Sequence, residues 1–353
     1  MAIPVDRNPH PKPHVPDEQL GFGTVFTDHM LRIEWDEGKG WHSDRIVPYG
    51  PIALDPAASA LHYGQLLFEG MKAYAYKDGQ PRIYRPLKHA ERLNVSAGKL
   101  CMPALDPARL VDGIKQLLNV DLGWLPKSPG TSMYVRPFML ATEPFLGVRP
   151  SRRYLLLVIL SPVGTYFKAE ERPLRLWVEG QKARAAHGGI GASKAAANYV
   201  ASLLAAEEAK HNGFDQVLWL DGARHENVEE VGTMNFMARI GDKVVTPALE
   251  GSILPGVTRD SVLQLLRKWA IPVEERTLPF AELAAAHAQG QLKEVFGTGT
   301  AAVVAPIGEL ATAKGTLELP ALGKDAYGPR LKEAILAIQR GDAPDEFGWL
   351  EKV

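Results

Sequence analysis

A short polar segment near the middle of the chain, residues 164–173 (GTYFKAEERP), places the strongest limit on the fold. It carries four closely spaced charges and ends in proline, a composition typical of a connection between domains. It divides the 353 residues into two halves, each of the size of an ordinary domain. We therefore expect a domain at residues 1–168, a linker at 169–177 and a second domain at 178–353.

The half before this segment has the pattern of strands followed by helices. Residues 30–35 alternate apolar and polar side chains, as a half-buried strand does. Two strand-like runs flank Lys77-Asp78-Gly79, which predicts a hairpin. Helical spacing appears at residues 89–101, and Asp106-Pro107 predicts the start of another helix. Further strands are expected at 134–140 and 154–160.

The half after the segment alternates between the two periods. A glycine-rich loop at residues 188–191 leads into a predicted helix at 195–211 that Asn212-Gly213 closes. Strands are expected at 174–178, 214–220, 234–240, 244–245, 294–301 and 303–304, and helices at about 257–269 and 281–289. The predicted fold class is α/β in the broad sense (α+β), with two domains.

The composition excludes several classes of protein. Hydrophobic residues make up 46% and charged residues 23%, which is ordinary for a globular chain. The formal net charge of −1 provides no general positive field for nucleic acid or an anionic membrane. The longest apolar run, residues 154–160, is too short to cross a bilayer. A single cysteine, Cys101, excludes an intrachain disulfide and favours a cytoplasmic location.

Two glycine-rich loops resemble nucleotide-binding motifs but fail in detail. Gly188–Ala195 lacks the second glycine and the hydroxyl residue of a nucleoside-triphosphate loop. Gly297-x-Gly299-x-x-Ala302 is followed by β-branched residues and Pro306, so no helix N-terminus is available for a pyrophosphate. The ten histidines are scattered without a metal-binding spacing, and we expect no metal site.

Lys194 is the most unusual charged residue. It lies between the glycine-rich loop and an alanine-rich run, and no Asp or Glu occurs from Gly180 through Ala206. A desolvated lysine surrounded by small residues has a lowered pKa and suits Schiff-base chemistry. A solvated loop lysine is the commoner case, and the local sequence leaves both open.

Three more segments offer groups for a flat anionic ligand. Glu230 stands beside apolar residues and is able to meet a cationic ring nitrogen, although a solvated turn acid is the commoner reading. The N–H groups of Val257 and Thr258 lie at an expected helix N-terminus, which suits a phosphate, unless Thr258 merely caps that helix. Gly299-Thr300-Ala301 provides further donors, or is only a tight turn. Together with Lys194, these are the parts of a pyridoxal 5′-phosphate site.

The chain resembles the branched-chain amino acid aminotransferases of the class IV pyridoxal-phosphate fold over nearly its whole length. Matching stretches are residues 26–30, 61–74, 134–137, 191–199, 216–220, 230–235, 253–259 and 296–301. This resemblance implies two domains, each with a sheet or barrel core flanked by helices, and an active site at their interface. It also implies transamination of branched-chain L-amino acids with 2-oxoglutarate through a pyridoxal-phosphate Schiff base on Lys194.

The resemblance assigns cofactor roles residue by residue. Lys194 would form the internal aldimine and move the proton between Cα and C4′. Glu230 would hold the ring nitrogen protonated, and Tyr199 would bond the phenolic oxygen. The phosphate would be bound by Arg92, Val257, Thr258 and Thr300. The remaining matches to cofactor-lining positions are Arg184, Thr233, Leu254, Gly256 and Gly299.

The resemblance also assigns substrate roles. Tyr134, Thr300 and Ala301 match positions near the α-carboxylate, and Arg136 matches a residue that handles the second carboxylate of glutamate. The apolar walls would be Phe22, Tyr63, Phe68 and Tyr166. Leu146 and Val148 match a loop contributed by the partner subunit of a homodimer. The Cys-x-x-Cys pair of the mammalian members is replaced by Ala302 and Ala305, so no redox regulation is expected there.

Two other interpretations compete with this one. The first is another class IV activity, such as D-amino acid transamination or aminodeoxychorismate lyase. The second is a catalytically silent scaffold or binding protein that has kept the fold. The complete set Lys194, Glu230, Tyr199 and Arg92 argues against the scaffold.

Overall fold

The computed structural model describes residues 2–164 and 172–353, which form two compact units. The first unit holds residues 2–164, 193–197 and 337–353, and the second holds 172–192 and 198–336. The expected domains differ from these units in two places, because residues 193–197 and 337–353 contact the first unit. The last residues do so through a C-terminal strand that pairs with Pro81–Tyr84. The expected linker is wrong at residues 174–177, because these residues pair with two neighbouring strands.

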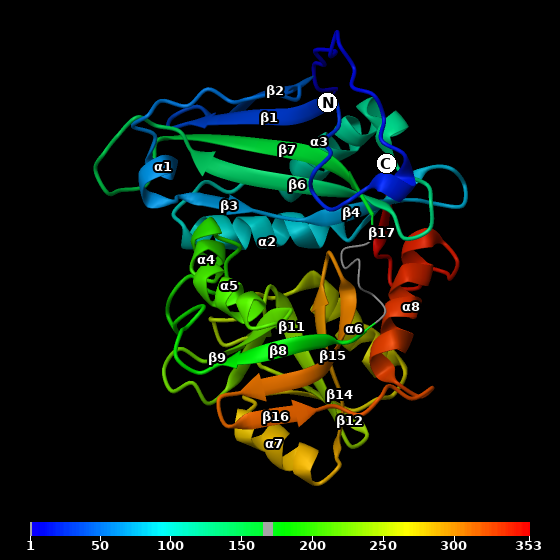
Figure 1. Cartoon of the computed structure of the whole chain (residues 1–353). Coiled ribbons are helices and arrows are strands. Elements are labelled where there is room, and N and C mark those ends of the chain that lie inside the picture. Colours follow the sequence, from blue (N-terminus) through cyan, green and yellow to red (C-terminus); the bar gives the residue numbers. More distant parts are fainter. Residues whose placement is uncertain (1, 165–171) are drawn as a thin grey trace. The chain divides into compact units, whose positions relative to one another are not determined.

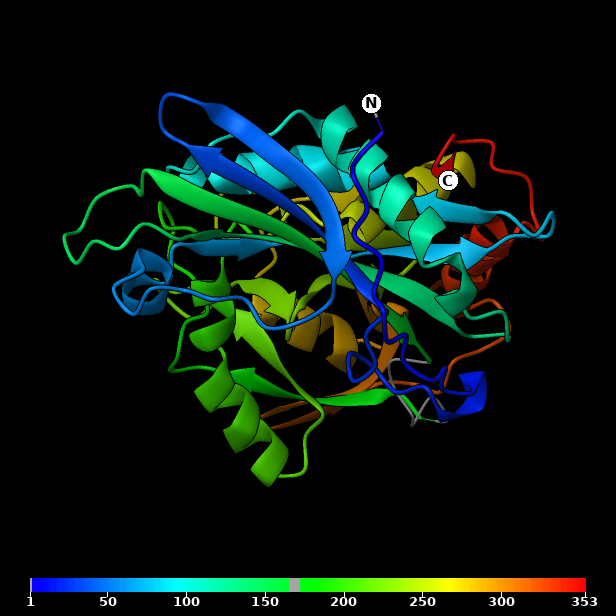
Figure 2. The ribbon, with the colours of Figure 1, turned by 90° about the horizontal axis from the view of Figure 1, so that it is seen from above.

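The described part of the first unit contains one eight-stranded sheet (Figure 1). Its order is β17-β5-β4-β6-β7-β1-β2, and β3 pairs with β6. The strands are β1 (His29–Asp36), β2 (Gly40–Pro48), β3 (Leu66–Phe68), β4 (Met71–Ala75), β5 (Pro81–Tyr84), β6 (Ser132–Ala141), β7 (Arg153–Val163) and β17 (Leu350–Lys352). All of its printed strand pairings are antiparallel. The N-terminal arm runs beside β2, where Val5 pairs with Ile46 (Figure 2).

Helices α2 (Pro86–Lys99) and α3 (Pro107–Val120) cover this sheet and bury their apolar faces in one core with its strands. The helix expected from Asp106-Pro107 is confirmed, because the Asp106 carboxylate accepts a hydrogen bond from the Ala108 N–H at 3.1 Å. α2 begins earlier than expected, at Pro86, a residue suited to a first helical turn. The unit also holds α1 (Ser59–Tyr63) and the 3₁₀ turns η1 (Asp17–Gln19) and η2 (Leu122–Trp124).

The described residues of the second unit form a nine-stranded sheet that closes into a barrel. The order is β10-β9-β8-β15-β14-β11-β12-β13, and β10 pairs with β11 as well as β9, so six strands form a ring. The strands are β8 (Leu174–Glu179), β9 (Gln216–Leu220), β10 (Val228–Val231), β11 (Met234–Ile240), β12 (Lys243–Thr246), β13 (Val273–Glu275), β14 (Leu292–Gly299), β15 (Val303–Thr312) and β16 (Gly315–Glu318). β14 and β15 form a hairpin, which confirms that no helix follows Gly299.

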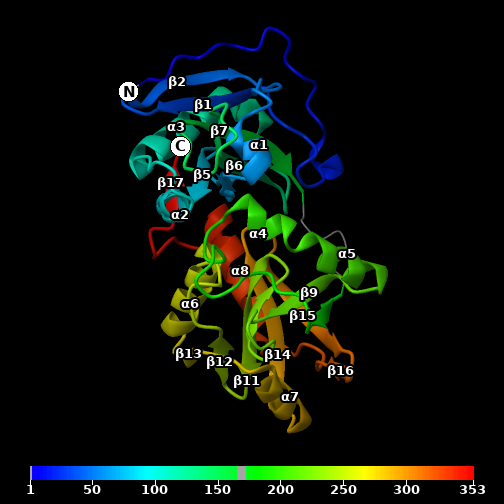
Figure 3. The same cartoon turned by 90° about the vertical axis from the view of Figure 1, so that its left-hand side faces the viewer.

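Helices of the second unit lie against different strands of this barrel. α5 (Leu203–His211) contacts β8 and β9, whereas α6 (Val257–Lys268) contacts β14 and β13 (Figure 3). α7 (Phe280–Ala288) also contacts β14. α4 (Ala196–Val200) and α8 (Tyr327–Arg340) each have residues in both units. Among the described residues, no helix is both long and apolar enough to span a membrane.

The single helix expected at residues 195–211 is wrong. The structure has α4 and α5, separated by a turn at 201–202. Ser202 explains the break, because its hydroxyl donates to the Tyr199 carbonyl oxygen at 2.7 Å and its N–H donates to the same oxygen at 3.2 Å. A serine side chain competes in this way with the regular helical hydrogen bond.

Candidate active site

Lys194 lies in an extended segment immediately before α4, in the first unit. Its carbonyl oxygen accepts from the Phe68 N–H at 3.1 Å, and its own N–H donates to Ser96 Oγ at 2.9 Å. Ala195 forms a β-bridge with Leu67. These backbone contacts to β3 and α2 hold the base of the lysine side chain in a fixed position. The expected solvated loop lysine is therefore wrong for the backbone, and the residue as a whole is half-buried.

Aromatic and cationic side chains gather around Phe68. The Lys194 Nζ lies 4.8 Å from the centre of the Phe68 ring, and the Arg136 guanidinium carbon lies 4.7 Å from it. Arg136 Nη2 donates to the Tyr134 hydroxyl at 3.1 Å. Phe22 packs edge-on against Tyr134, with ring centres 5.1 Å apart. The first unit thus brings together five of the residues expected to bind cofactor or substrate.

Arg92 is held by a buried carboxylate that sequence reasoning missed. Glu69 Oε1 accepts from Arg92 Nε at 2.7 Å, and Oε2 accepts from Nη2 at 2.9 Å. His89 Nδ1 lies 2.9 Å from the same Oε2. Glu69 is fully buried, which raises the pKa of its carboxyl, but the Arg92 charge and these hydrogen bonds outweigh burial and hold it well below its usual range. The one acid in the apolar run Leu66–Met71 was the signal that could have revealed it.

The second unit places Glu230 inside β10, not in the turn before a strand. It is 4% exposed, so the solvated turn acid is wrong. Its Oε1 accepts from the Leu254 N–H at 2.8 Å, and Arg184 Nε lies 3.2 Å from its Oε2 in an ion pair that is not aligned as a hydrogen bond. Asn235 donates to the Leu254 carbonyl oxygen at 2.9 Å and fixes the same segment. A buried, paired carboxylate of this kind is suited to a cationic ring nitrogen.

The start of α6 is shaped for a close ligand. Gly256 is the N-cap and offers no side chain to cap the helix. A Cβ atom there would lie 1.9 Å from Asn235 Oδ1, so only glycine fits. Val257 and Thr258 form the first turn and are buried at the positive end of the helix dipole. The expected helix start is confirmed.

The other expected residues of the second unit are less enclosed. Gly299, Thr300 and Ala301 are half-buried at the turn from β14 to β15. Thr298 Oγ1, just before them, is buried and has no hydrogen-bond partner within residues 2–164 and 172–353. Tyr199 is half-buried in α4, and Thr233 is exposed in the turn after β10.

The remaining expected residues lie in exposed parts of the first unit. Leu146 and Val148 are 62% and 85% exposed, and Tyr63 is 47% exposed. The Tyr63 hydroxyl donates to the Leu146 carbonyl oxygen. Tyr166 lies outside the described residues.

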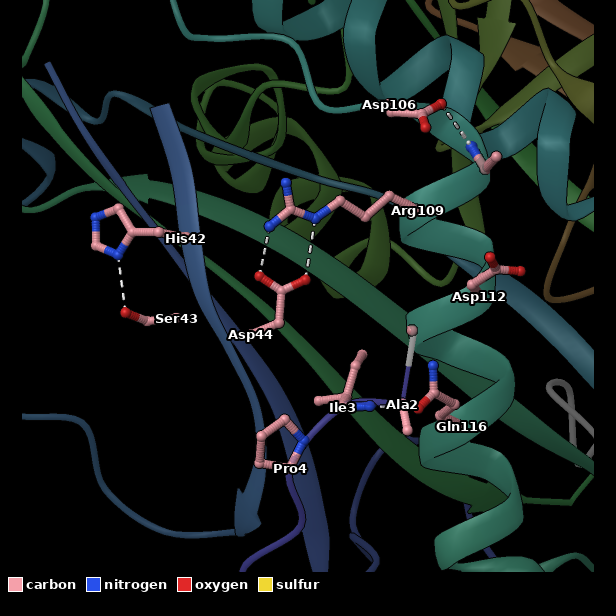
Figure 4. A pocket seen from close by; sticks show the side chains of 12 residues that line it. Ala2, Ile3, Pro4, His42, Ser43, Asp44, Asp106, Arg109, Asp112 and Gln116 are labelled. Atoms are coloured by element: carbon pink, nitrogen blue, oxygen red, sulfur yellow. Dashed lines mark hydrogen bonds and ion pairs between the residues drawn. The ribbon is translucent and has the colours of Figure 1, made fainter. Parts of the chain in front are cut away.

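A cavity of about 560 Å³ lies elsewhere in the first unit, between the N-terminal arm, β2 and α3 (Figure 4). Arg109 crosses it and donates to both Asp44 oxygens, at 2.6 and 3.0 Å. Gln116 Oε1 accepts from the Ile3 N–H at 2.8 Å. The described residues that line it include none of those expected in the active site, so this cavity is a separate feature.

Comparisons with known proteins agree with this set of residues. A family model described as Amino-transferase class IV matches residues 66–310. The chain belongs to the class IV aminotransferases. Branched-chain-amino-acid aminotransferase 2 of Bacillus subtilis (strain 168) is 47% identical over 353 residues, covering 100% of this chain and 97% of the relative. A branched-chain-amino-acid aminotransferase of Mycobacterium tuberculosis is 44% identical over 338 residues, covering 94% and 92%.

Solved structures of this family share the fold. The branched-chain amino acid aminotransferase of Escherichia coli superposes with a TM-score of 0.74 at 25% identity, covering 90% of this chain and 98% of its own. A branched-chain amino acid aminotransferase from T.th., solved with pyridoxamine 5′-phosphate, gives 0.73 at 26% identity, covering 90% and 97%. The expected class IV fold is confirmed, and the chain is an aminotransferase of the branched-chain-amino-acid type. The family depends on pyridoxal 5′-phosphate.

Proposed function

We propose that this enzyme reversibly transfers the amino group of leucine, isoleucine or valine to 2-oxoglutarate, with pyridoxal 5′-phosphate bound covalently to Lys194. The observation that carries the proposal is the position of Lys194 Nζ over Phe68, whose ring also contacts Arg136. An amine, an aromatic wall and a guanidinium in one cluster fit a substrate that has an α-carboxylate and an apolar side chain.

The chain's residues fit the cofactor. Thr298 Oγ1 is a buried donor without a partner among the described residues, beside the small residues Gly299 and Thr300. The glycine N-cap of α6 leaves room for a phosphate at the positive end of a helix. When bound, pyridoxal 5′-phosphate supplies an electron sink that stabilises negative charge at the substrate Cα.

Each cofactor-binding residue then has a definite task. Glu230 keeps the proton on the pyridine nitrogen, and Tyr199 orients the ring through its phenolic oxygen. The Lys194 amine accepts the proton from the substrate Cα and returns it to C4′. The phosphate is bound by Arg92, Val257, Thr258 and Thr300, and Arg184, Thr233, Leu254, Gly256 and Gly299 line the cofactor.

Substrate selection follows from the first unit. Phe22, Tyr63 and Phe68, with Tyr166, form the apolar wall that favours branched side chains, at about 0.8 kcal/mol per buried CH₂. Tyr134, Thr300 and Ala301 bind the α-carboxylate. Arg136 binds the second carboxylate of glutamate. Its Nε is buried and has no hydrogen-bond partner among the described residues, so a carboxylate would satisfy a donor that is otherwise costly to bury.

We also propose a homodimer whose partner subunit covers part of this region. Leu146 and Val148 are large apolar side chains exposed on one loop, and such patches mark interaction sites. The single cysteine supports a cytoplasmic location.

The decisive experiment is a half-reaction titration. The purified enzyme is mixed with each L-amino acid in turn, and loss of the visible absorption band of the bound cofactor is followed. Leucine, isoleucine, valine and glutamate should bleach the band, and aromatic or small amino acids should do so far more slowly. Bleaching by D-amino acids, or pyruvate release from aminodeoxychorismate, would identify another class IV activity. A colourless enzyme that binds no cofactor would identify a silent scaffold.

The Lys194→Ala variant tests the attachment point. It should lose both the visible band and turnover. Lys210→Ala, which removes an exposed lysine of α5, is the matched control and should keep both. A Lys194→Ala enzyme with the band and turnover of the parent would refute the assignment.

A further inference from the structure

Strand β10 carries two successive buried glutamates, and the proposed function uses only one of them. Glu229 is 6% exposed and Glu230 is 4% exposed. Burial of an acid is costly unless its charge is paired or its proton is retained. Glu229 therefore needs a physical account of its own.

A β-bulge explains how two adjacent carboxylates reach related positions. Val228 pairs with Leu220 and Val231 pairs with Leu218, so three steps along β10 match two steps along β9. Side chains of a regular strand alternate between its two faces. The extra residue in the bulge interrupts that alternation where Glu229 and Glu230 stand.

A short chain of contacts joins the two carboxylates. Ser252 Oγ donates to Glu229 Oε1, and the Ser252 carbonyl oxygen accepts from Arg184 Nη2. Arg184 in turn forms the ion pair with Glu230. The same segment continues to Leu254, whose N–H donates to Glu230. Any change at Glu229 thus acts on the residues that hold Glu230.

The charges around Glu229 do not balance if both acids are ionised. Arg184 follows β8 and is the cation that faces the pair, while Asp221, at the end of β9, adds a further negative charge. Glu229 Oε2 is buried without a hydrogen-bond partner among the described residues. Burial raises the pKa of the Glu229 carboxyl, and the Ser252 hydroxyl and Arg184 offset this only in part.

We propose that Glu229 is a positioning residue: a second proton-binding carboxyl that acts through Ser252 and Arg184 on Glu230. With its proton, Glu229 leaves the Arg184 charge to Glu230. Without it, a second negative charge lies beside Glu230 and favours protonated groups on the cofactor. The effect on the cofactor rests on the proposed role of Glu230, whereas the coupling itself is a property of the protein alone.

The apoenzyme tests the coupling. For an acid whose pKa is raised by folding, the folded state binds more protons, so stability falls as the pH rises from the ordinary value of 4.5 through the folded value. Glu229→Gln keeps the shape and removes this titration. In urea unfolding from pH 4 to pH 9, the variant should gain on the parent by up to about tenfold per pH unit in the unfolding equilibrium constant within that window.

Two further variants keep the test decisive. Glu226→Gln makes the same charge change at an exposed site of the same loop, and its curve should run parallel to that of the parent. Ser252→Ala removes the hydroxyl that stabilises ionised Glu229, so proton release should move to higher pH. This second variant replaces Glu229→Gln if that protein fails to fold. Parallel curves for the parent and every variant at Glu229 or Ser252 would overturn the proposal.

The holoenzyme tests the effect on the cofactor. The pH midpoint of the visible band should lie lower in Glu229→Gln than in the parent, because the variant lacks the charge that favours the protonated form. Glu226→Gln should keep the parental midpoint. An unchanged midpoint in Glu229→Gln, with a normal visible band in the parent, overturns the positioning role and leaves the proposed function intact. A parent enzyme with no visible band would instead refute the proposed function.

Discussion

A Cβ atom at Gly70 would lie 1.9 Å from the hydroxyl oxygen of Tyr134. Gly70 connects β3 to β4, and its backbone is not in the left-handed region, so space rather than conformation demands glycine here. The Tyr134 hydroxyl accepts a hydrogen bond from Arg136 at 3.1 Å and is nearly buried. Gly70 thus makes room for a hydroxyl that the proposed function assigns to the substrate carboxylate.

Replacing Gly70 with alanine should therefore impair substrate binding. The added methyl group displaces the Tyr134 hydroxyl, and we expect KM to rise about tenfold or more for leucine and glutamate alike, since each good hydrogen bond to a charged group is worth about 1.5–3 kcal/mol. The visible band should persist. Steady-state kinetics with both substrates provide the measurement.

Gly98→Ala is the matched control. No atom lies within 4 Å of a Cβ there, and the residue is exposed on α2. That variant should keep its kinetics and gain about 0.5–1 kcal/mol of stability. Equal KM values for Gly70→Ala and the parent would remove the spatial argument.

Replacing Glu69 with glutamine should destabilise the first unit. The change leaves Arg92 buried without its charge partner, and breaking a buried pair in this way costs about 3–5 kcal/mol. The lowered pKa of Glu69 means that this contribution is present above the ordinary pKa of 4.5 and is lost as the pH falls through the folded value. Urea unfolding at pH 7 should show the full difference, and the gap should narrow in strongly acidic buffer.

Glu91→Gln removes an exposed acid from the same helix, where it pairs with Lys88 at 2.9 Å. Surface pairs contribute about 0–1 kcal/mol, so this control should unfold almost like the parent. A Glu69→Gln protein as stable as Glu91→Gln would contradict the assigned pairing with Arg92.

Replacing Arg136 with methionine should separate the two substrates. The variant keeps an apolar stem beside Phe68 but cannot bind a second carboxylate. We expect the glutamate half-reaction to slow by about 10–100-fold and the leucine half-reaction to change by less than about threefold. Stopped-flow bleaching of the visible band measures both rates. Arg153→Met, at an exposed site on β7, should alter neither. Equal losses for leucine and glutamate would argue against a carboxylate-binding role.

Local signals allowed much of the fold to be predicted. The strand at β1, the β4–β5 hairpin and the capped start of α3 depend on neighbouring residues, and all three are confirmed. The break at Ser202 was missed because a serine hydrogen bond outweighed a favourable helical composition. The closing pair of the barrel, β10 with β11, was also beyond a local pattern, because the ring depends on strands far apart in the chain.

The site divides in the same way. Lys194 could be singled out because its neighbours lack acids, and the start of α6 because glycine precedes an amphipathic run. Glu69 could not, because its partner Arg92 stands 23 residues away and their pairing depends on how α2 packs. The bulge at Glu229 depends on the register of β9, which no single-strand pattern contains.

Strand β17 has a consequence for how the protein is made. It supplies the outer partner of β5, and the residues it pairs lie more than 260 positions apart in the chain. During synthesis on the ribosome, β5 must wait with an open edge until residues 350–352 emerge, long after the rest of its sheet has been translated. Open strand edges invite pairing with other chains. Nascent chains stalled before residue 350 should therefore be the species most dependent on chaperones.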